Sequence, residues 1–247
     1  GGTMCPSFMA TRNEKNSTRA RANILREFLT LSPKKNPFDH SEIYDIMDLC
    51  VSCKGCKSEC PSSEDMARYK AEFLQHWWDK HGIPLRTRAV AYISSLNRIG
   101  MLFPAITNYL FTNKFIANLF KRVLGIAPKR SIPLLYRYTL SRWLKRNKHK
   151  LLPHRKPIGS VYLFIDEFTE YNDTEIGIKA VELLTRLGYE VKIAVHKESG
   201  RAFISKGLIR KAARFANFNV TTFKNIIDAQ TPLVGIEPSG ILSFRDE

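Results

Sequence analysis

Four cysteines and a proline packed into one short stretch constrain this chain more than any other feature of its sequence. They are Cys50, Cys53, Cys56, Cys60 and Pro61, in the pattern C-x-x-C-x-x-C-x-x-x-C-P. This pattern is typical of loops that bind a cubane [4Fe–4S] cluster. Three thiolates two residues apart on one tight loop suit three iron corners of such a cube. The last cysteine is set apart by the longer gap and by the fixed φ of proline, so it usually serves a second cluster.

The chain has one further cysteine, Cys5, which also precedes a proline. In proteins with two clusters, the fourth ligand of one cluster comes from another Cys-Pro pair. The predicted ligands of one [4Fe–4S] cluster are therefore Cys5, Cys50, Cys53 and Cys56. Cys60 is expected to bind a second cluster whose other ligands lie outside this chain.

Disulfides and structural zinc are the alternative uses of these cysteines. Five closely spaced cysteines cannot all pair, and neighbours this close in sequence do not bridge without strain. Zinc sites usually combine two C-x₂-C pairs separated by a longer loop. A zinc-stabilised module without redox activity remains the alternative. Free thiols with iron–sulfur ligation favour a reducing compartment, so a cytoplasmic protein is expected.

The net charge of +16 is concentrated in the middle of the chain. Residues 80–165 include seventeen Lys and Arg but no Asp or Glu. A basic amphipathic segment of this kind suits four partners. They are a larger acidic partner domain, an anionic membrane surface on the cytoplasmic side, an acidic redox partner and nucleic acid. Nucleic acid is the least expected, because no helix-turn-helix, zinc-finger or RNP-like pattern accompanies the charge.

Apolar spacing predicts helices on both sides of the cysteine loop. One lies within residues 12–31, with Ser17 or Thr18 as its N-cap, and a second covers 41–49, with Ser41 as its cap. A third runs over about 65–81, after a capping turn. Residues 1–81 are therefore expected to form an all-α ferredoxin-type module. Residues 82–157 form a basic helical connector with one or two amphipathic helices around 102–120.

The last third alternates strand-like and helical patterns. Strands are predicted at 160–166, 189–195 and 231–237, with helices at 174–187, 206–215 and 220–228. Such alternation predicts a parallel sheet, so residues 158–247 are expected to form an incomplete α/β domain. Asp166, His196 and Glu237 follow the strands and should meet at the carboxyl edge, where α/β sheets bind ligands.

These residues resemble one family, the large bacterial FAD-linked oxidoreductases of the glycolate oxidase, D-lactate dehydrogenase and D-2-hydroxyglutarate dehydrogenase group. The resemblance covers nearly the whole chain, and its cysteine motifs are the most specific part. In the first third it is carried by residues 4–12, 17–23, 49–61 and 65–73. In the last third, residues 200–201, 205–207, 235–239 and 245–247 resemble the cysteine-rich domain shared with heterodisulfide reductases.

The resemblance implies an electron-transfer segment of a dehydrogenase that oxidises a 2-hydroxy acid to a 2-oxo acid. FAD would be bound by domains upstream in the same polypeptide, and the cluster would pass electrons to a quinone, cytochrome or other carrier. The chain lacks an initiator methionine and a signal segment, and we expect it to be a fragment. No residue of this fragment is expected to be catalytic.

The last domain departs from the family pattern. The family has Cys-Cys-Gly-Arg and Glu-Pro-Ser-Cys where this chain has Glu198, Ser199 and Gly240, and no cysteine follows Cys60. Carboxylate and hydroxyl groups are poor substitutes for thiolate ligands of soft metals. We therefore expect this domain to serve as a scaffold or an interaction surface, with Glu198 and Ser199 lining a cleft.

Overall fold

The computed structural model describes residues 5–153 and 155–246 and is mostly helical, with one small parallel sheet. The chain divides into two compact units. Unit 1 comprises Gly1–Pro84 with Phe203–Ile209, and unit 2 comprises Leu85–Ala202 with Arg210–Glu247. The expected mixture of helical and α/β parts is confirmed at this level. The finer division at 1–81, 82–157 and 158–247 stays a prediction.

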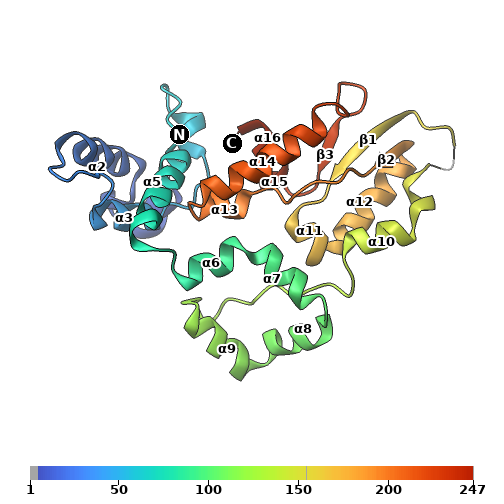
Figure 1. Cartoon of the computed structure of the whole chain (residues 1–247), viewed down its shortest axis with the longest axis horizontal. Coiled ribbons are helices and arrows are strands. Elements are labelled where there is room, and N and C mark those ends of the chain that lie inside the picture. The colour runs from blue at the N-terminus through green and yellow to red at the C-terminus, as the bar shows by residue number, and fades with distance from the viewer. Residues whose placement is uncertain (1–4, 154, 247) are drawn as a thin grey trace. The chain divides into compact units, whose positions relative to one another are not determined.

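Unit 1 is built from helices around the cysteine loop (Figure 1). The elements are α1 (Pro6–Thr11), η1 (Glu14–Asn16), α2 (Thr18–Leu31), α3 (Ser41–Asp48), α4 (Gly55–Glu59) and α5 (Met66–His81). Ser17 caps α2 as predicted, because its side chain accepts a hydrogen bond from the Ala20 N–H. The prediction of Ser41 as a cap is wrong: His40 occupies the N-cap, and the Ser41 hydroxyl bonds instead to Glu42.

The core of unit 1 lies along α5. Its buried face includes Met66, Phe73, Leu74 and Trp78, at the spacing of a helical stripe. The segment 203–209 packs onto this helix, where the Trp78 indole N–H donates to the Lys206 carbonyl at 2.8 Å. Gly207 has a φ of +70°, and a Cβ there would lie 2.1 Å from the Leu74 Cβ. Only glycine therefore fits this contact.

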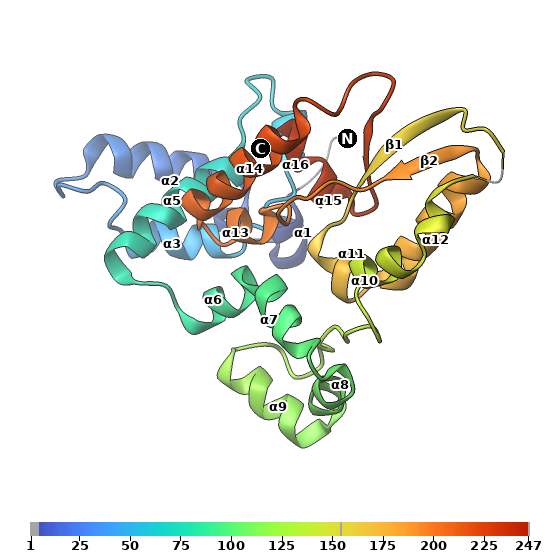
Figure 2. The ribbon, with the colours of Figure 1, turned by 45° about the vertical axis from the view of Figure 1, so that its right-hand side comes forward.

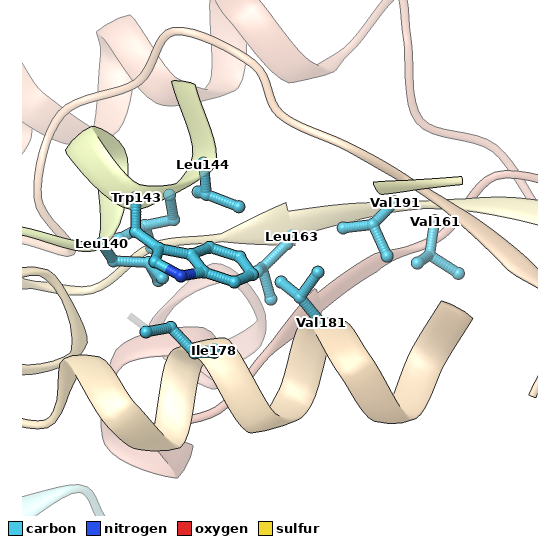
Figure 3. Close-up of a cluster of buried hydrophobic side chains, with 9 residues drawn as sticks. Leu140, Trp143, Leu144, Val161, Leu163, Ile178, Val181 and Val191 are labelled. Carbon is cyan, nitrogen blue, oxygen red and sulfur yellow. The ribbon is translucent and has the colours of Figure 1, made fainter. Parts of the chain in front are cut away.

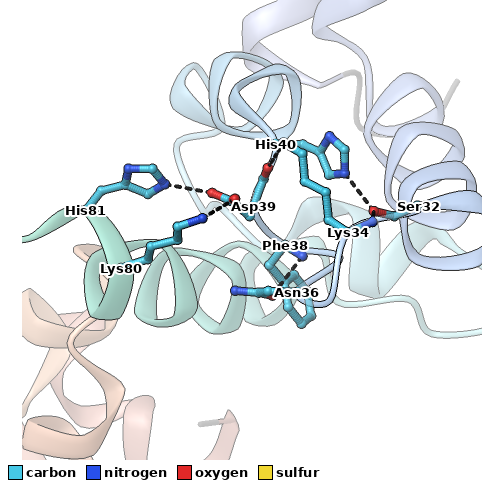
Figure 4. A network of polar contacts seen from close by, with 8 residues as sticks. All are labelled: Ser32, Lys34, Asn36, Phe38, Asp39, His40, Lys80 and His81. Carbon is cyan, nitrogen blue, oxygen red and sulfur yellow. Dashed lines mark hydrogen bonds and ion pairs between the residues drawn. The ribbon is translucent and has the colours of Figure 1, made fainter.

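A polar network joins the loop after α2 to the end of α5 (Figure 4). Asp39 accepts from Lys80 and lies 2.9 Å from His81 Nε2, so two groups in the last turn of α5 share one carboxylate. The Ser32 hydroxyl and His40 Nε2 lie 2.8 Å apart at the other end of the network. Hydrogen bonds from Lys80 and His81 lower the pKa of Asp39 to about 2. The charged form of Asp39 therefore favours the folded state.

Asp39→Asn is expected to lower the unfolding temperature of unit 1 at neutral pH. Since the pKa of Asp39 is depressed on folding, its stabilising contribution is present above about pH 4 and is lost as the pH falls through about 2. Thermal unfolding measured by circular dichroism across this range should show the gap to wild type closing at low pH. Asp45→Asn, on the exposed face of α3, is the control. A gap that stayed constant with pH would contradict this account.

Unit 2 begins with helices of the basic segment. They are α6 (Leu85–Ala91), α7 (Ile93–Gly100), α8 (Pro104–Thr112), α9 (Lys114–Val123), α10 (Leu140–Arg146) and the short η2 (Lys148–Leu151). The pair α8 and α9 corresponds to the predicted amphipathic helices, and Figure 2 shows the pair as a hairpin. Among the described residues, no helix is long and apolar enough to cross a membrane.

The sheet of unit 2 has the order β2-β1-β3, with all strands parallel as predicted. Its elements are β1 (Gly159–Phe164), α11 (Glu167–Tyr171), α12 (Thr174–Arg186), β2 (Tyr189–Lys192), α13 (Arg201–Ser205), α14 (Ile209–Phe223), β3 (Leu233–Gly235), α15 (Pro238–Ile241) and α16 (Ser243–Asp246). The predicted break between helices at 206–215 and 220–228 is wrong, because α14 is continuous. Asn219 is buried within this helix, and its side-chain amide bonds to the backbone of Lys197 and Glu198.

One apolar cluster stabilises unit 2. Figure 3 shows side chains of α10, α12 and the strands packed together. Leu163 on the central strand is 2% exposed, and Val181 on α12 and Leu140 on α10 are fully buried. A Cβ on Gly177 would lie 2.5 Å from a Leu140 methyl, so α12 and α10 approach closely there. This packing fixes the carboxyl edge of the sheet.

Candidate functional site

Four of the five cysteines line one pocket in unit 1. Cys5 comes from the start of α1, whereas Cys50, Cys53 and Cys56 come from the loop between α3 and α4 and from α4 itself. Cys60, at the end of α4, is not among the lining residues. The structure therefore brings together two segments far apart in sequence, and the ligand grouping stays a prediction. The other lining residues come from α1, α2, the loop before α4, α4 and the start of α5; among them are Ser7, Thr18, Arg21, Met66 and Ala67.

The backbone of the loop is strained on either side of Cys53. Ser52 has a φ of +54° and Lys54 a φ of +59°, both in the left-handed region. Non-glycine residues held in that region cost about 1–3 kcal/mol each and gather at functional sites. Lys54 is also the N-cap of α4, so this left-handed residue leads directly into the helix that carries Cys56. The loop presents its cysteines at the expense of local stability.

Cys5 lies among polar groups that favour its thiolate. Its sulfur is 3.2 Å from the Ser7 hydroxyl and accepts from the Arg21 guanidinium at 3.3 Å. Burial raises the pKa of the Cys5 thiol, but hydrogen bonds from Ser7, Arg21 and Thr18 outweigh this effect and bring the pKa down to about 7. A substantial share of Cys5 is therefore thiolate at neutral pH, which is the form that binds metals.

Two lysines connect the cysteine loop to α5 through polar contacts. Lys54 forms an ion pair with Asp65 at 3.0 Å, and Asp65 also caps α5 by accepting from the Arg68 N–H. Lys70 is buried, and its ammonium donates to the carbonyls of Asp48 at 3.2 Å and Cys50 at 2.6 Å. Burial lowers the pKa of Lys70. These contacts join the loop to α5 and bring positive charge close to the pocket.

Sequence reasoning missed Arg21 and Lys70 as parts of the site. Arg21 shares the buried face of α2 with Leu25, and Lys70 lies on the buried stripe of α5 between Met66 and Leu74. A charged residue at a position where helical spacing calls for an apolar one was the available signal. This signal is present in the sequence at both positions and could have marked them as candidates.

The pocket differs from a site for a single metal ion. Among residues 5–153 and 155–246, no three His, Cys, Asp or Glu side chains converge as ligands of one ion. Tetrahedral zinc needs four donors within about 2.0–2.3 Å of one point. A cubane distributes its thiolates over separate iron corners, so it needs cysteines arranged around a larger group. The donor set, four cysteines from two segments of the chain, fits a [4Fe–4S] cluster.

The predicted edge of the sheet in unit 2 is occupied by structural contacts. Asp166 caps α11 and Glu237 caps α15, and His196 accepts from the Ile165 N–H at 3.2 Å. The Ser199 hydroxyl donates to the buried Glu167 at 2.9 Å, and a Cβ on Gly240 would lie 3.7 Å from the Ser199 Cβ.

The three positions that depart from the family pattern also lie near this edge. Ser199 and Gly240 are neighbours there, and burial raises the pKa of the adjacent Glu198. The groups available are carboxylates, hydroxyls and backbone. This part of the sheet therefore has no thiolate with which to bind a soft metal.

Comparison with known proteins gives one family match and several similar enzymes. Residues 2–65 match a family described as a 4Fe–4S dicluster domain, so the first quarter of the chain is similar to iron–sulfur domains. Over 99% of its length, the chain is similar to D-2-hydroxyglutarate dehydrogenases: 26% identical to that of Pseudomonas putida, 24% to that of Escherichia coli and 26% to that of Haemophilus influenzae. The chain spans only 27–28% of these relatives. No solved structure gives a significant match.

These similarities confirm the resemblance to iron–sulfur oxidoreductases that act on 2-hydroxy acids. The number of cysteines limits the number of clusters that this chain could bind by itself. Each cubane held only by cysteines takes four of them, and this chain has five. Its own cysteines therefore suffice for one cluster, and a second would need ligands from elsewhere.

Proposed function

We propose that this chain is the electron-transfer segment of a FAD-linked dehydrogenase that oxidises a 2-hydroxy acid, with D-2-hydroxyglutarate as the first candidate. The observation that carries the proposal is the pocket lined by Cys5 and by three cysteines of the loop, with Cys60 outside it. The similarity of almost the entire chain to D-2-hydroxyglutarate dehydrogenases supports the reaction type. FAD and the substrate would be bound by upstream domains of the same polypeptide.

The proposed ligands of the cluster are Cys5, Cys50, Cys53 and Cys56, with Cys60 assigned to a second cluster. When bound, a [4Fe–4S] cluster accepts and donates single electrons. The chain's own residues prepare the site: Arg21 and Ser7 stabilise the Cys5 thiolate, and Lys70 fixes the carbonyl of Cys50. The strained loop at Ser52 and Lys54 orients the remaining thiolates. The division into an iron–sulfur module, a basic connector and an α/β domain is part of the same proposal.

The proposal is tested in the full polypeptide that carries this segment. Anaerobic addition of D-2-hydroxyglutarate should produce the electron paramagnetic resonance signal of a reduced cluster, together with the 2-oxo acid. The signal should be missing in Cys53→Ser, while reduction of the flavin by the substrate persists. Flavin reduction without any cluster signal in the wild-type protein would contradict the electron-transfer role. The final acceptor, whether a quinone, a cytochrome or another carrier, would then be sought by its ability to reoxidise the protein.

A zinc-stabilised module without redox activity is the competing proposal. It predicts a colourless protein with stoichiometric zinc that stays unchanged under dithionite. The loop spacing C-x-x-C-x-x-C, in place of two C-x₂-C pairs separated by a longer loop, favours the cluster.

Peripheral binding to an anionic membrane is a second function, and a surface on α8 and α9 favours it. On α9, Phe115, Leu119 and Val123 are spaced four residues apart and are 81%, 55% and 61% exposed. On α8, Ile106 and Tyr109 are exposed as well. Lysines and arginines flank this hairpin, and acids are absent from residues 80–165. Apolar side chains beside unopposed cations suit the boundary of anionic headgroups, at roughly 1 kcal/mol per cation.

The chain is therefore expected to cosediment with vesicles containing an anionic phospholipid, and more weakly as salt is added, since salt screens the charges. Leu119→Ser should weaken the binding because it removes an apolar contact. Leu183→Ser is the matched control, since this leucine is 58% exposed on α12, away from the hairpin. Absence of binding, or binding that ionic strength does not change, would rule out this second function.

A further inference from the structure

Arg21 is a buried cation aimed at the cysteine pocket. Arg21 is 1% exposed. Its guanidinium donates three hydrogen bonds to three different residues. Nε donates to the Ile46 carbonyl at 3.0 Å, one terminal nitrogen donates to the Cys5 sulfur at 3.3 Å, and the other donates to the Ser7 hydroxyl at 2.8 Å. One side chain thus ties the end of α3 to the segment that carries Cys5.

The charge of Arg21 has no carboxylate partner among the described residues. Its hydrogen-bond acceptors are a carbonyl, a hydroxyl and a sulfur. By contrast, Lys54 beside the same pocket is neutralised by Asp65 at 3.0 Å. An unpaired buried charge is costly, so buried cations usually face an anion. An iron–sulfur cluster held by four thiolates would be such an anion, and Arg21 lines the pocket whose cysteines would hold it.

We propose that Arg21 is a positioning residue that raises the reduction potential of the cluster. The inference rests on the proposed function. One-electron reduction adds a negative charge to the cluster, and a fixed guanidinium within hydrogen-bond distance of the Cys5 sulfur stabilises the more negative state. Lys70 acts differently, because it bonds to the carbonyls of Asp48 and Cys50 and not to a sulfur. Arg21 therefore places its positive charge directly against the sulfur of Cys5, a proposed ligand atom.

The test is a dithionite titration of the anaerobically reconstituted chain, followed by electron paramagnetic resonance. Arg21→Gln removes the charge and should make the cluster at least about tenfold harder to reduce, which corresponds to about 59 mV for one electron. Arg21→Lys keeps the charge but loses the planar fork, so its potential should fall in the same direction by less. The potential is measured on loaded molecules, so partial occupancy does not affect it.

Arg19→Gln is the matched control. Arg19 lies on the same helix but is exposed, and it pairs with Glu14 at 3.0 Å. Its potential should equal that of wild type. A shift as large as that of Arg21→Gln would show that net charge alone acts and would overturn the proposal.

The other outcomes also decide the matter. If Arg21→Gln and Arg21→Lys lose cluster content but keep the wild-type potential, Arg21 is purely structural and the proposal is wrong. If Arg21→Gln binds no cluster, the test rests on the reduction potential of Arg21→Lys. A wild-type potential in Arg21→Lys then rejects the proposal. A wild-type chain that binds no cluster would instead refute the proposed function. The two failures are thus distinguishable.

Discussion

Cys53→Ser is expected to abolish cluster binding, whereas Cys60→Ser leaves it intact. Cys53 lines the pocket between two residues with left-handed backbones, and no other described cysteine can take its place without rearranging the loop. Serine oxygen is a harder donor than thiolate and is a poor ligand for iron–sulfur clusters. Cys60 lies outside the pocket, so its loss should not disturb the cluster that the other four bind.

The measurement is iron and acid-labile sulfide per chain after anaerobic reconstitution of both variants. Cys53→Ser should fall to the level of a mock reconstitution without iron, and Cys60→Ser should retain the wild-type content. Circular dichroism of both variants before reconstitution shows whether the helices are intact. Equal loss in the two variants would mean that Cys60 belongs to the same cluster, which contradicts the grouping proposed here.

Leu163→Ala is expected to destabilise unit 2 by about 2–5 kcal/mol, the range for large-to-small changes in a core. Leu163 is 2% exposed on β1, which pairs with both other strands of the sheet. Its truncation leaves a cavity that neighbours from α10 and α12 cannot fill without moving. Trp143 belongs to the same cluster, whereas Trp77 and Trp78 lie on α5 of unit 1. In a background with Trp77→Phe and Trp78→Phe, the remaining tryptophan fluorescence therefore reports the unfolding of unit 2.

The control for this prediction is Leu183→Ala on α12. Leu183 is 58% exposed, so the change should cost less than about 0.5 kcal/mol. Urea titrations of the two variants and wild type give the comparison. Similar midpoints for Leu163→Ala and wild type would show that the described core does not stabilise this unit.

Local signals in the sequence predicted much of the fold. Ser17 marked the start of α2, and the positive φ of Gly188 explains why the helix before it ends there. The alternation of strands and helices predicted a parallel sheet, because parallel strands need helical crossovers. Each of these features depends on a few adjacent residues, so the sequence alone was enough.

Other features depended on contacts between distant segments. Asn219 lies in the continuous α14, at a position where a break was predicted, and its amide bonds to the backbone of Lys197 and Glu198 some twenty residues earlier. No local pattern contains that information. The same holds for the site: the cysteine spacing suggests a set of ligands, but Arg21 contacts Cys5 and Ile46 only in the folded chain. The charged residue on an apolar stripe was visible in the sequence, but its partner was not.

Binding of one iron–sulfur cluster by the cysteines of the pocket can be measured by chemical analysis of the wild-type chain, reconstituted and purified without oxygen. We expect about four iron and four sulfide per chain, with a broad visible absorbance that dithionite bleaches. A colourless protein that contains zinc, or that retains neither iron nor sulfide, would contradict it.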